Sequence, residues 1–189
     1  LFNANELITN LLKSNNNDDS KIFKDDLSLS LDLKKVYINK KDIVKNLKGE
    51  LNIKDNKVVK ADISAFFNQS ENLRFTINTN NGEKITTFYS SRAKPIVKRY
   101  KFIKGYEEGY LDFYSSKKDG ISTSKLKIYN FKLQELPALT KLLTLASLQG
   151  IADTLSGEGI RFDEFEMNFK NKDNLMTIDE IFAIGPAIS

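Results

Sequence analysis

Strict alternation of apolar and polar residues recurs along most of this chain of 189 residues. In residues 26–33, for example, four leucines alternate with Asp and Ser. A period of two residues predicts a β-strand that buries only one face. Nine runs of this kind can be recognised, beginning near residues 27, 47, 59, 73, 85, 109, 126, 160 and 176. The alternation therefore restricts the chain to a mainly β fold.

Turn residues separate several of these runs. The clearest turns are Asp55-Asn56-Lys57, Asn80-Asn81-Gly82 and Lys118-Asp119-Gly120. Asn and Gly tolerate the positive φ that tight hairpins require. We therefore expect antiparallel hairpins with one apolar face. Around the turn at Asn81-Gly82 the pattern assigns six residues to that face: Leu73, Phe75, Ile77, Ile85, Thr87 and Tyr89.

The apolar parity shifts in three of the runs. It changes after Lys34-Lys35, at Tyr129-Asn130 and across Asp163-Glu164. A shift of this kind indicates a β-bulge or a bend. The last two shifts flank one predicted helix, so we expect two strands that bend around it.

Residues 137–155 predict that helix. Pro137 suits a first helical turn, and Ser156-Gly157 supplies a stop. Apolar residues cover most of its circumference, which is typical of a helix that is buried or that faces lipid. The segment is too short to cross a bilayer on its own. We expect it to pack on the sheet and to cap one end of a groove through Leu139, Leu142, Leu143, Leu145, Leu148 and Ile151.

Residues 92–104 form a second helix candidate, with lysines recurring on one side at Lys94, Lys98 and Lys101. A basic amphipathic helix can lie on an anionic membrane, and basic residues interleaved with aromatic ones can bind nucleic acid. Lysines that snorkel from a helix covering a sheet are the more common case. We therefore expect a covering helix and no nucleic-acid partner.

The composition excludes several kinds of chemistry. Because the chain has no His and no Cys, it cannot build a Ser-His or Cys-His nucleophile, a thiolate or imidazole zinc site, or a disulfide. Carboxylates cluster at 163–166 and at Glu107-Glu108, but a solvated strand edge explains them better than acid-base catalysis or calcium binding. The net charge of +4 arises from charges of alternating sign, which is a weak argument for a polyanionic partner. We expect no enzyme activity, no metal and no cofactor.

Nothing in the chain marks a linker, so we expect a single domain over residues 1–189. Within it, residues 1–90 form a strand-rich part, and residues 91–189 form a second part that contains both helix candidates and the last strands. The sequence begins without Met and stops just after a strand pattern, so we expect a fragment of a longer protein.

The predicted sheet has more apolar surface than the helices can cover. Nine strands at about 4.8 Å each give a width of about 43 Å. Two helices, each about 10 Å across, cover about 20 Å of it. The rest must be covered by curling of the sheet, by a second sheet or by an apolar ligand. The expected fold is α+β: a curved, groove-like antiparallel sheet of meandering hairpins with one or two covering helices.

Four segments of the second half of the chain resemble a known family. They are NFKL at 130–133, PALTKLLTLASLQGI at 137–151, LSGEGIRFDEFEMNF at 155–169 and Gly185-Pro186. Through them, residues 91–189 resemble the AsmA-like C-terminal region of large bacterial envelope proteins of the YhdP type. The earlier strands fit the preceding part of that region more loosely.

The resemblance implies an architecture similar to that of bridge-like lipid-transfer proteins. In that family a chain anchored in the inner membrane of a Gram-negative bacterium builds a curved sheet across the periplasm. Its apolar groove is implicated in phospholipid traffic to the outer membrane, and contact with the membranes is made by parts that lie outside this fragment.

We therefore hypothesise a segment without catalysis that holds phospholipid acyl chains. Its expected groove lining is Leu51, Ile53, Ile63, Phe75, Ile77, Leu111 and Phe113. The alternative is a structural or assembly module of the envelope. In that case packing closes the apolar face completely, and the surface binds another envelope protein.

Overall fold

The computed structural model describes residues 26–39, 41–98, 105–134 and 159–186. The predicted helix at 137–155, with its six proposed capping residues, lies outside the described residues. The described elements, in chain order, are β1 Leu27–Tyr37, β2 Ile43–Lys54, β3 Lys57–Phe66, β4 Asn72–Asn80, β5 Glu83–Ser90, α2 Lys94–Val97, β6 Tyr106–Lys118, β7 Ile121–Leu133, β8 Ile160–Lys172 and β9 Leu175–Ile184.

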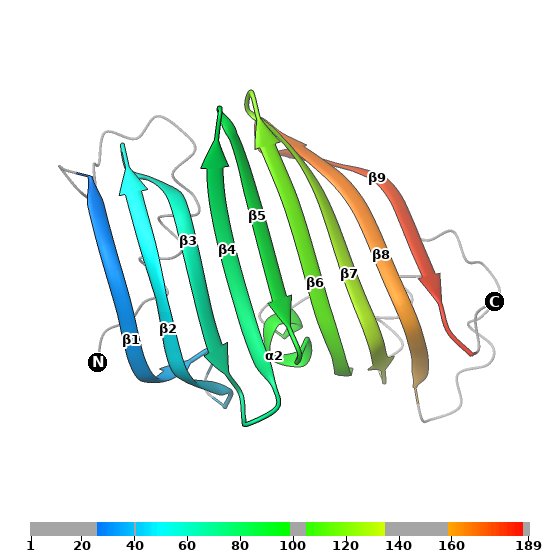
Figure 1. The fold of residues 1–189 in the computed structure, drawn as a ribbon. Coiled ribbons are helices and arrows are strands. Elements are labelled where there is room, and N and C mark those ends of the chain that lie inside the picture. Colours follow the sequence, from blue (N-terminus) through cyan, green and yellow to red (C-terminus); the bar gives the residue numbers. More distant parts are fainter. Residues whose placement is uncertain (1–25, 40, 99–104, 135–158, 187–189) are drawn as a thin grey trace.

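The nine strands form one sheet in which each strand pairs, antiparallel, with its neighbours in sequence (Figure 1). The predicted number of strands and the meandering topology are thus confirmed. The sheet is neither closed nor strongly curled, and α2 is the single short helix among the described residues. The described fold is therefore nearly all-β, rather than the expected α+β fold with a groove-like sheet. None of its helical residues belongs to a segment long and apolar enough to span a membrane.

The predicted turns have the expected backbone geometry. Asp55, Asn81 and Asp119 all have positive φ, at 49°, 49° and 51°. The face assignment after Asn81-Gly82 was wrong, because a two-residue turn pairs odd-numbered positions with even-numbered ones. Leu73, Phe75 and Ile77 lie opposite Ser90, Phe88 and Thr86, so Ile85, Thr87 and Tyr89 occupy the other face.

The parity shifts in β7 and β8 are confirmed, and they lie beside each other. Ile128 and Phe131 are both buried although three positions apart, as are Phe162 and Phe165. The β6–β7 register continues unbroken across this point, because β6 is irregular at the same level, where Gly109 has a φ of +78°. Three adjacent strands therefore kink in step. The helix around which the strands were expected to bend lies outside the described residues.

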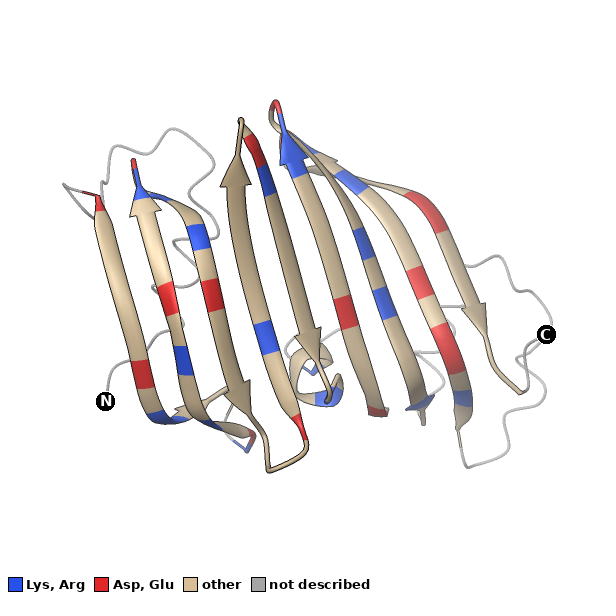
Figure 2. Cartoon of the chain, in the orientation of Figure 1, with Lys and Arg blue, Asp and Glu red and all other residues tan. Residues whose placement is uncertain are grey.

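The sheet has one apolar face and one polar face. The apolar face is defined by three clusters of buried side chains, which Phe88 and Phe75 connect. The polar face carries cross-strand ion pairs such as Asp62–Arg74 and Lys127–Glu166. Charged residues of both signs recur along the strands in Figure 2. This division is what the two-residue alternation predicts.

Candidate functional site

The seven predicted groove residues all lie on the apolar face. The register places Ile63 opposite Phe75, Phe75 opposite Phe88, and Phe88 opposite Phe113. Ala61 lies opposite both Leu51 and Ile77. Ile53 and Leu111 belong to buried clusters of the same face. The structure thus brings these residues onto one surface that crosses β2 to β6.

The seven residues differ in burial. Ile53 and Ile77 are 1% and 2% exposed, and Leu111 and Leu51 are also buried. Ile63, Phe75 and Phe113 are only half-buried. The three half-buried side chains keep part of their surface free for a bound molecule, whereas protein already covers the four buried ones.

The apolar face becomes polar toward one end in three successive rows across β4–β7. The first row is Phe75, Phe88, Phe113 and Leu126. The second is Ile77, Thr86, Ser115 and Ser124. The third is Thr79, Lys84, Lys117 and Ser122. Side chains on one face therefore pass from rings, through hydroxyls, to ammonium groups.

The two lysines of the third row are close neighbours on β5 and β6. Burial lowers the pKa of Lys84, and the charges of Lys117 and Lys57 lower it further. Like charges directly opposite each other on a sheet are destabilising. An anion near Lys84 and Lys117 would relieve this repulsion. In the second row Ser124 is buried, and its hydroxyl donates to the Ser115 hydroxyl over 2.9 Å.

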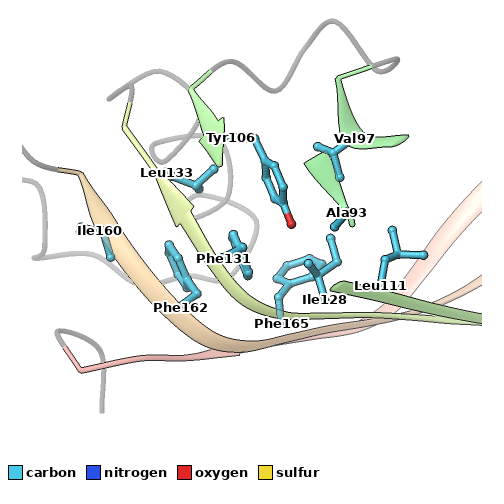
Figure 3. Close-up of a cluster of buried hydrophobic side chains, with 10 residues drawn as sticks. All are labelled: Ala93, Val97, Tyr106, Leu111, Ile128, Phe131, Leu133, Ile160, Phe162 and Phe165. Carbon is cyan, nitrogen blue, oxygen red and sulfur yellow. The ribbon is translucent and has the colours of Figure 1, made fainter. Parts of the chain in front are cut away.

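A row of three stacked rings on the same face was not among the predicted site residues. Tyr106 stacks on Phe131, and Phe131 stacks on Phe162, with centroid distances of 5.3 and 4.8 Å. Figure 3 shows these rings among the aliphatic side chains of β6–β8. Phe131 and Phe162 were recognisable as apolar strand positions, but only the strand register shows that they are opposite each other.

The Tyr106 hydroxyl is buried and has no hydrogen-bond partner within the described part of the chain. Burial raises the pKa of this phenol well above its usual 10. In Figure 3 the hydroxyl points into the cluster, toward Ala93 and Phe131. Tyr106 is therefore neutral at physiological pH and acts as a packing group.

Helix α2 covers the apolar face at β6. The Ala93 amide donates to the carbonyl of Gly109 over 2.7 Å, and Val97 is buried in the same cluster as Tyr106. Lys94, one of the three predicted basic residues, forms an ion pair with Glu107 of β6. Lys101 lies outside the described residues. This part of the helix fits the covering role that the sequence favoured.

Two of the three carboxylates at 163–166, Glu164 and Glu166, form cross-strand ion pairs with Lys127. The expected strand edge was wrong in its location, because β8 lies between β7 and β9. Glu166 accepts from Lys125 at 2.7 Å and from Lys127 at 2.8 Å. Hydrogen bonds from Lys125, Lys127 and Asn168 lower the pKa of Glu166 to about 2. Glu164 and Glu166 thus have cationic neighbours across the strands, which suits a structural role.

No family model, curated protein or solved structure matches this chain.

Proposed function

We propose that this chain is a non-catalytic segment of a bacterial envelope protein, and that its apolar face binds phospholipid in transit between inner and outer membrane. As in the family it resembles, the parent protein is anchored in the inner membrane and this segment lies in the periplasm. The observation that supports the proposal best is the passage from rings through hydroxyls to lysines on one face. This order of side chains complements an amphiphile, with the rings against its apolar part and the lysines against an anionic head group.

The dimensions of the rows suit a phospholipid. From Phe88 to Lys84 the strand advances four residues, about 13 Å at 3.3 Å per residue. Acyl chains can lie on the half-buried Phe75 and Phe113, and the phosphate can reach Lys84 and Lys117. Ester oxygens then lie near the hydroxyls of the row between.

The alternative function is a structural or assembly module that binds envelope proteins without carrying lipid. Ile53 and Ile77 are only 1% and 2% exposed, so protein already covers them. This favours the structural module for the β2–β4 part of the face. In this case Ile77→Asp unfolds the domain, because an unpaired buried charge is costly. If lipid covers the position, the variant folds but holds less lipid.

Photo-crosslinking in cells tests the main proposal. A crosslinking residue replaces Phe75 or Phe113, and in the control it replaces Asn78, which is exposed on the polar face of β4. We expect phospholipid attached at the first two positions and not at the third. Absence of lipid at Phe75 and Phe113 in folded protein would favour the structural module.

A charge variant tests the orientation of the lipid. Lys84→Glu combined with Lys117→Glu should reduce the recovery of crosslinked phospholipid at Phe113. The control is Lys60→Glu, an exposed lysine opposite Asn78 on the other face. Equal recovery in all three proteins would mean that the lysines do not contact the phosphate.

A further inference from the structure

The two outer strands of the sheet leave one side of their backbones without a strand partner in the described part of the chain. β1 pairs only with β2, and β9 only with β8. β9 also exposes five large apolar side chains: Leu175, Met176, Ile178, Phe182 and Ile184. Long, apolar, exposed edge strands are templates for pairing with another strand.

β1 and β9 share an irregularity in their alternation. In β1, Leu33 and Val36 both lie on the apolar side, with Lys34 and Lys35 between them. In β9, Ile178 lies opposite the buried Phe169 and Ile181 opposite Met167, with Asp179 and Glu180 between. A β-bulge in the β8–β9 register accounts for the second case. Each outer strand therefore has a pair of charges at its kink, basic in β1 and acidic in β9.

The strand count fixes how two copies can extend the sheet. Because nine strands alternate in direction, β1 and β9 run the same way. A second copy placed beside the first by translation presents its β1 parallel to β9, with the apolar faces on the same side. With Asp179 beside Lys34, Glu180 falls beside Lys35.

That register matches the remaining side chains as well. Ile178 then lies beside Leu33, and Ile181 beside Val36, so the two kinks coincide. On the polar face the exposed Phe182 falls beside Tyr37, which is also exposed. A register shifted by one residue would place apolar residues of one strand beside polar residues of the other.

We propose that β9 binds β1 of a second copy of this chain in parallel, so that the sheets join head to tail. The contact is heterologous, and translation does not close it into a dimer. The apolar face then continues from one copy to the next.

Charge favours this pairing over the two symmetric alternatives. Antiparallel pairing of β9 with itself brings Asp179 and Glu180 against their own copies, and pairing of β1 with itself does the same with two lysines. Like charges directly opposite on a sheet are destabilising. Lys35 already lies opposite Lys45 within one copy, so an acidic neighbour relieves an existing repulsion. Asp179 also pairs with Lys170 at 3.1 Å, and its second oxygen can accept from another lysine.

Sedimentation velocity of the 189-residue chain, at rising concentration and low salt, tests the proposal. We expect species heavier than the 21.5 kDa monomer whose mass keeps growing with concentration. An acid-reversed variant (Asp179→Lys, Glu180→Lys) and a base-reversed variant (Lys34→Glu, Lys35→Glu) should each associate at least about tenfold more weakly. An equimolar mixture of the two should regain association, because every contact in an alternating array is again between opposite charges.

A control variant carries the same charge change away from the edges. Glu50→Lys with Asp112→Lys alters exposed positions of β2 and β6 and should associate like the unmodified chain. Circular dichroism verifies folding, and Glu180→Lys and Lys35→Glu alone repeat the test if a double variant unfolds. A monomer at every concentration, a dimer that does not grow, or a mixture that fails to regain association would overturn the proposal. So would a base-reversed variant that associates normally, because it would indicate pairing of β9 with itself.

Discussion

The two halves of the apolar face are packed in different ways. In β6–β8 the core is an aromatic row, Tyr106, Phe131 and Phe162, with α2 lying over it. In β2–β4 it is an aliphatic patch whose buried members are Leu51, Ile53, Val58, Ala61 and Ile77. Large rings stacked across strands and small branched side chains thus close neighbouring parts of one surface. The same alternation of sequence can therefore support two different cores.

The halves also differ in how irregularities are accommodated. At the kink of β6–β8 every strand deviates at one level, so the register is unbroken. Between β2 and β3 the register shifts at Lys45/Lys48, beside Asn46 with a φ of 51°. Rings can stack over three strands only where the rows stay aligned. The aligned kink and the aromatic row are therefore parts of one arrangement.

Truncation of the central ring should have the largest effect. Phe131→Ala removes a side chain that is 1% exposed and stacks on both of its neighbours. We expect a loss of about 4 kcal/mol in unfolding free energy, measured by urea denaturation. Phe182→Ala, at a 47% exposed position, is the matched control and should change little. A loss below about 1 kcal/mol at Phe131 would mean that the row contributes no more than a surface residue.

Truncation in the aliphatic patch should have a smaller effect. Ile53→Ala, at a 1% exposed position, should lower the unfolding free energy by about 3 kcal/mol. The half-buried Ile63 loses less apolar burial, so Ile63→Ala should cost about 1 kcal/mol. Equal losses of unfolding free energy in the two variants would contradict this difference, and would mean that Ile53 and Ile63 are covered to the same extent.

The kink of β6–β8 needs a glycine at position 109 for two reasons, the positive φ and the lack of space for a Cβ. A pair of glycine variants separates these two reasons. Gly109 and Gly120 have nearly equal φ values of +78° and +80°. A Cβ at Gly109 would lie 2.8 Å from the carbonyl oxygen of Tyr129, whereas one at Gly120 would meet nothing within 4 Å. Gly120→Ala should cost about 1 kcal/mol from backbone strain, and Gly109→Ala about 2 kcal/mol more from crowding. Equal melting temperatures of the two variants would contradict a crowded kink.

The sequence predicted the structure correctly where local interactions determine it, as in the strands and the turns. Alternation predicted all nine strands, and Asn-Gly and Asp-Gly predicted the turns with positive φ. The face assignment of Ile85, Thr87 and Tyr89 failed because the length of the turn, not the apolar pattern, sets the phase between β4 and β5. Strict counting through the Asn81-Gly82 turn would have corrected it.

The candidate site was harder to predict because it depends on which strands are neighbours. Phe75 and Phe113 were correctly placed on the apolar face. The row containing Lys84 and Lys117 joins residues 33 positions apart, and no local pattern reveals it. The lysine partners of Glu166 likewise come from a different strand. Side chains that interact across strands become visible only with the register.

We expect the smallest effect on stability from ion pairs of the polar face, which also differ between the two halves. Glu166, whose side chain is 17% exposed, has cationic partners in β7, whereas the Asp62–Arg74 pair of the other half is more than half exposed. Because the folded pKa of Glu166 lies near 2, below its usual 4.5, its ionised form stabilises the fold above pH 4.5. This contribution is lost as the pH falls from about 4.5 to about 2.

Glu166→Gln should therefore cost about 1 kcal/mol at pH 7, a value reduced by solvent screening. The difference from the unmodified chain should shrink below pH 4.5 and vanish near pH 2, as followed by urea denaturation at a series of pH values. Asp62→Asn, in the exposed pair, should cost less than Glu166→Gln at pH 7, because exposed ion pairs contribute little. A cost at Glu166 that is independent of pH would mean that the side chain stabilises β8 through packing rather than through its charge.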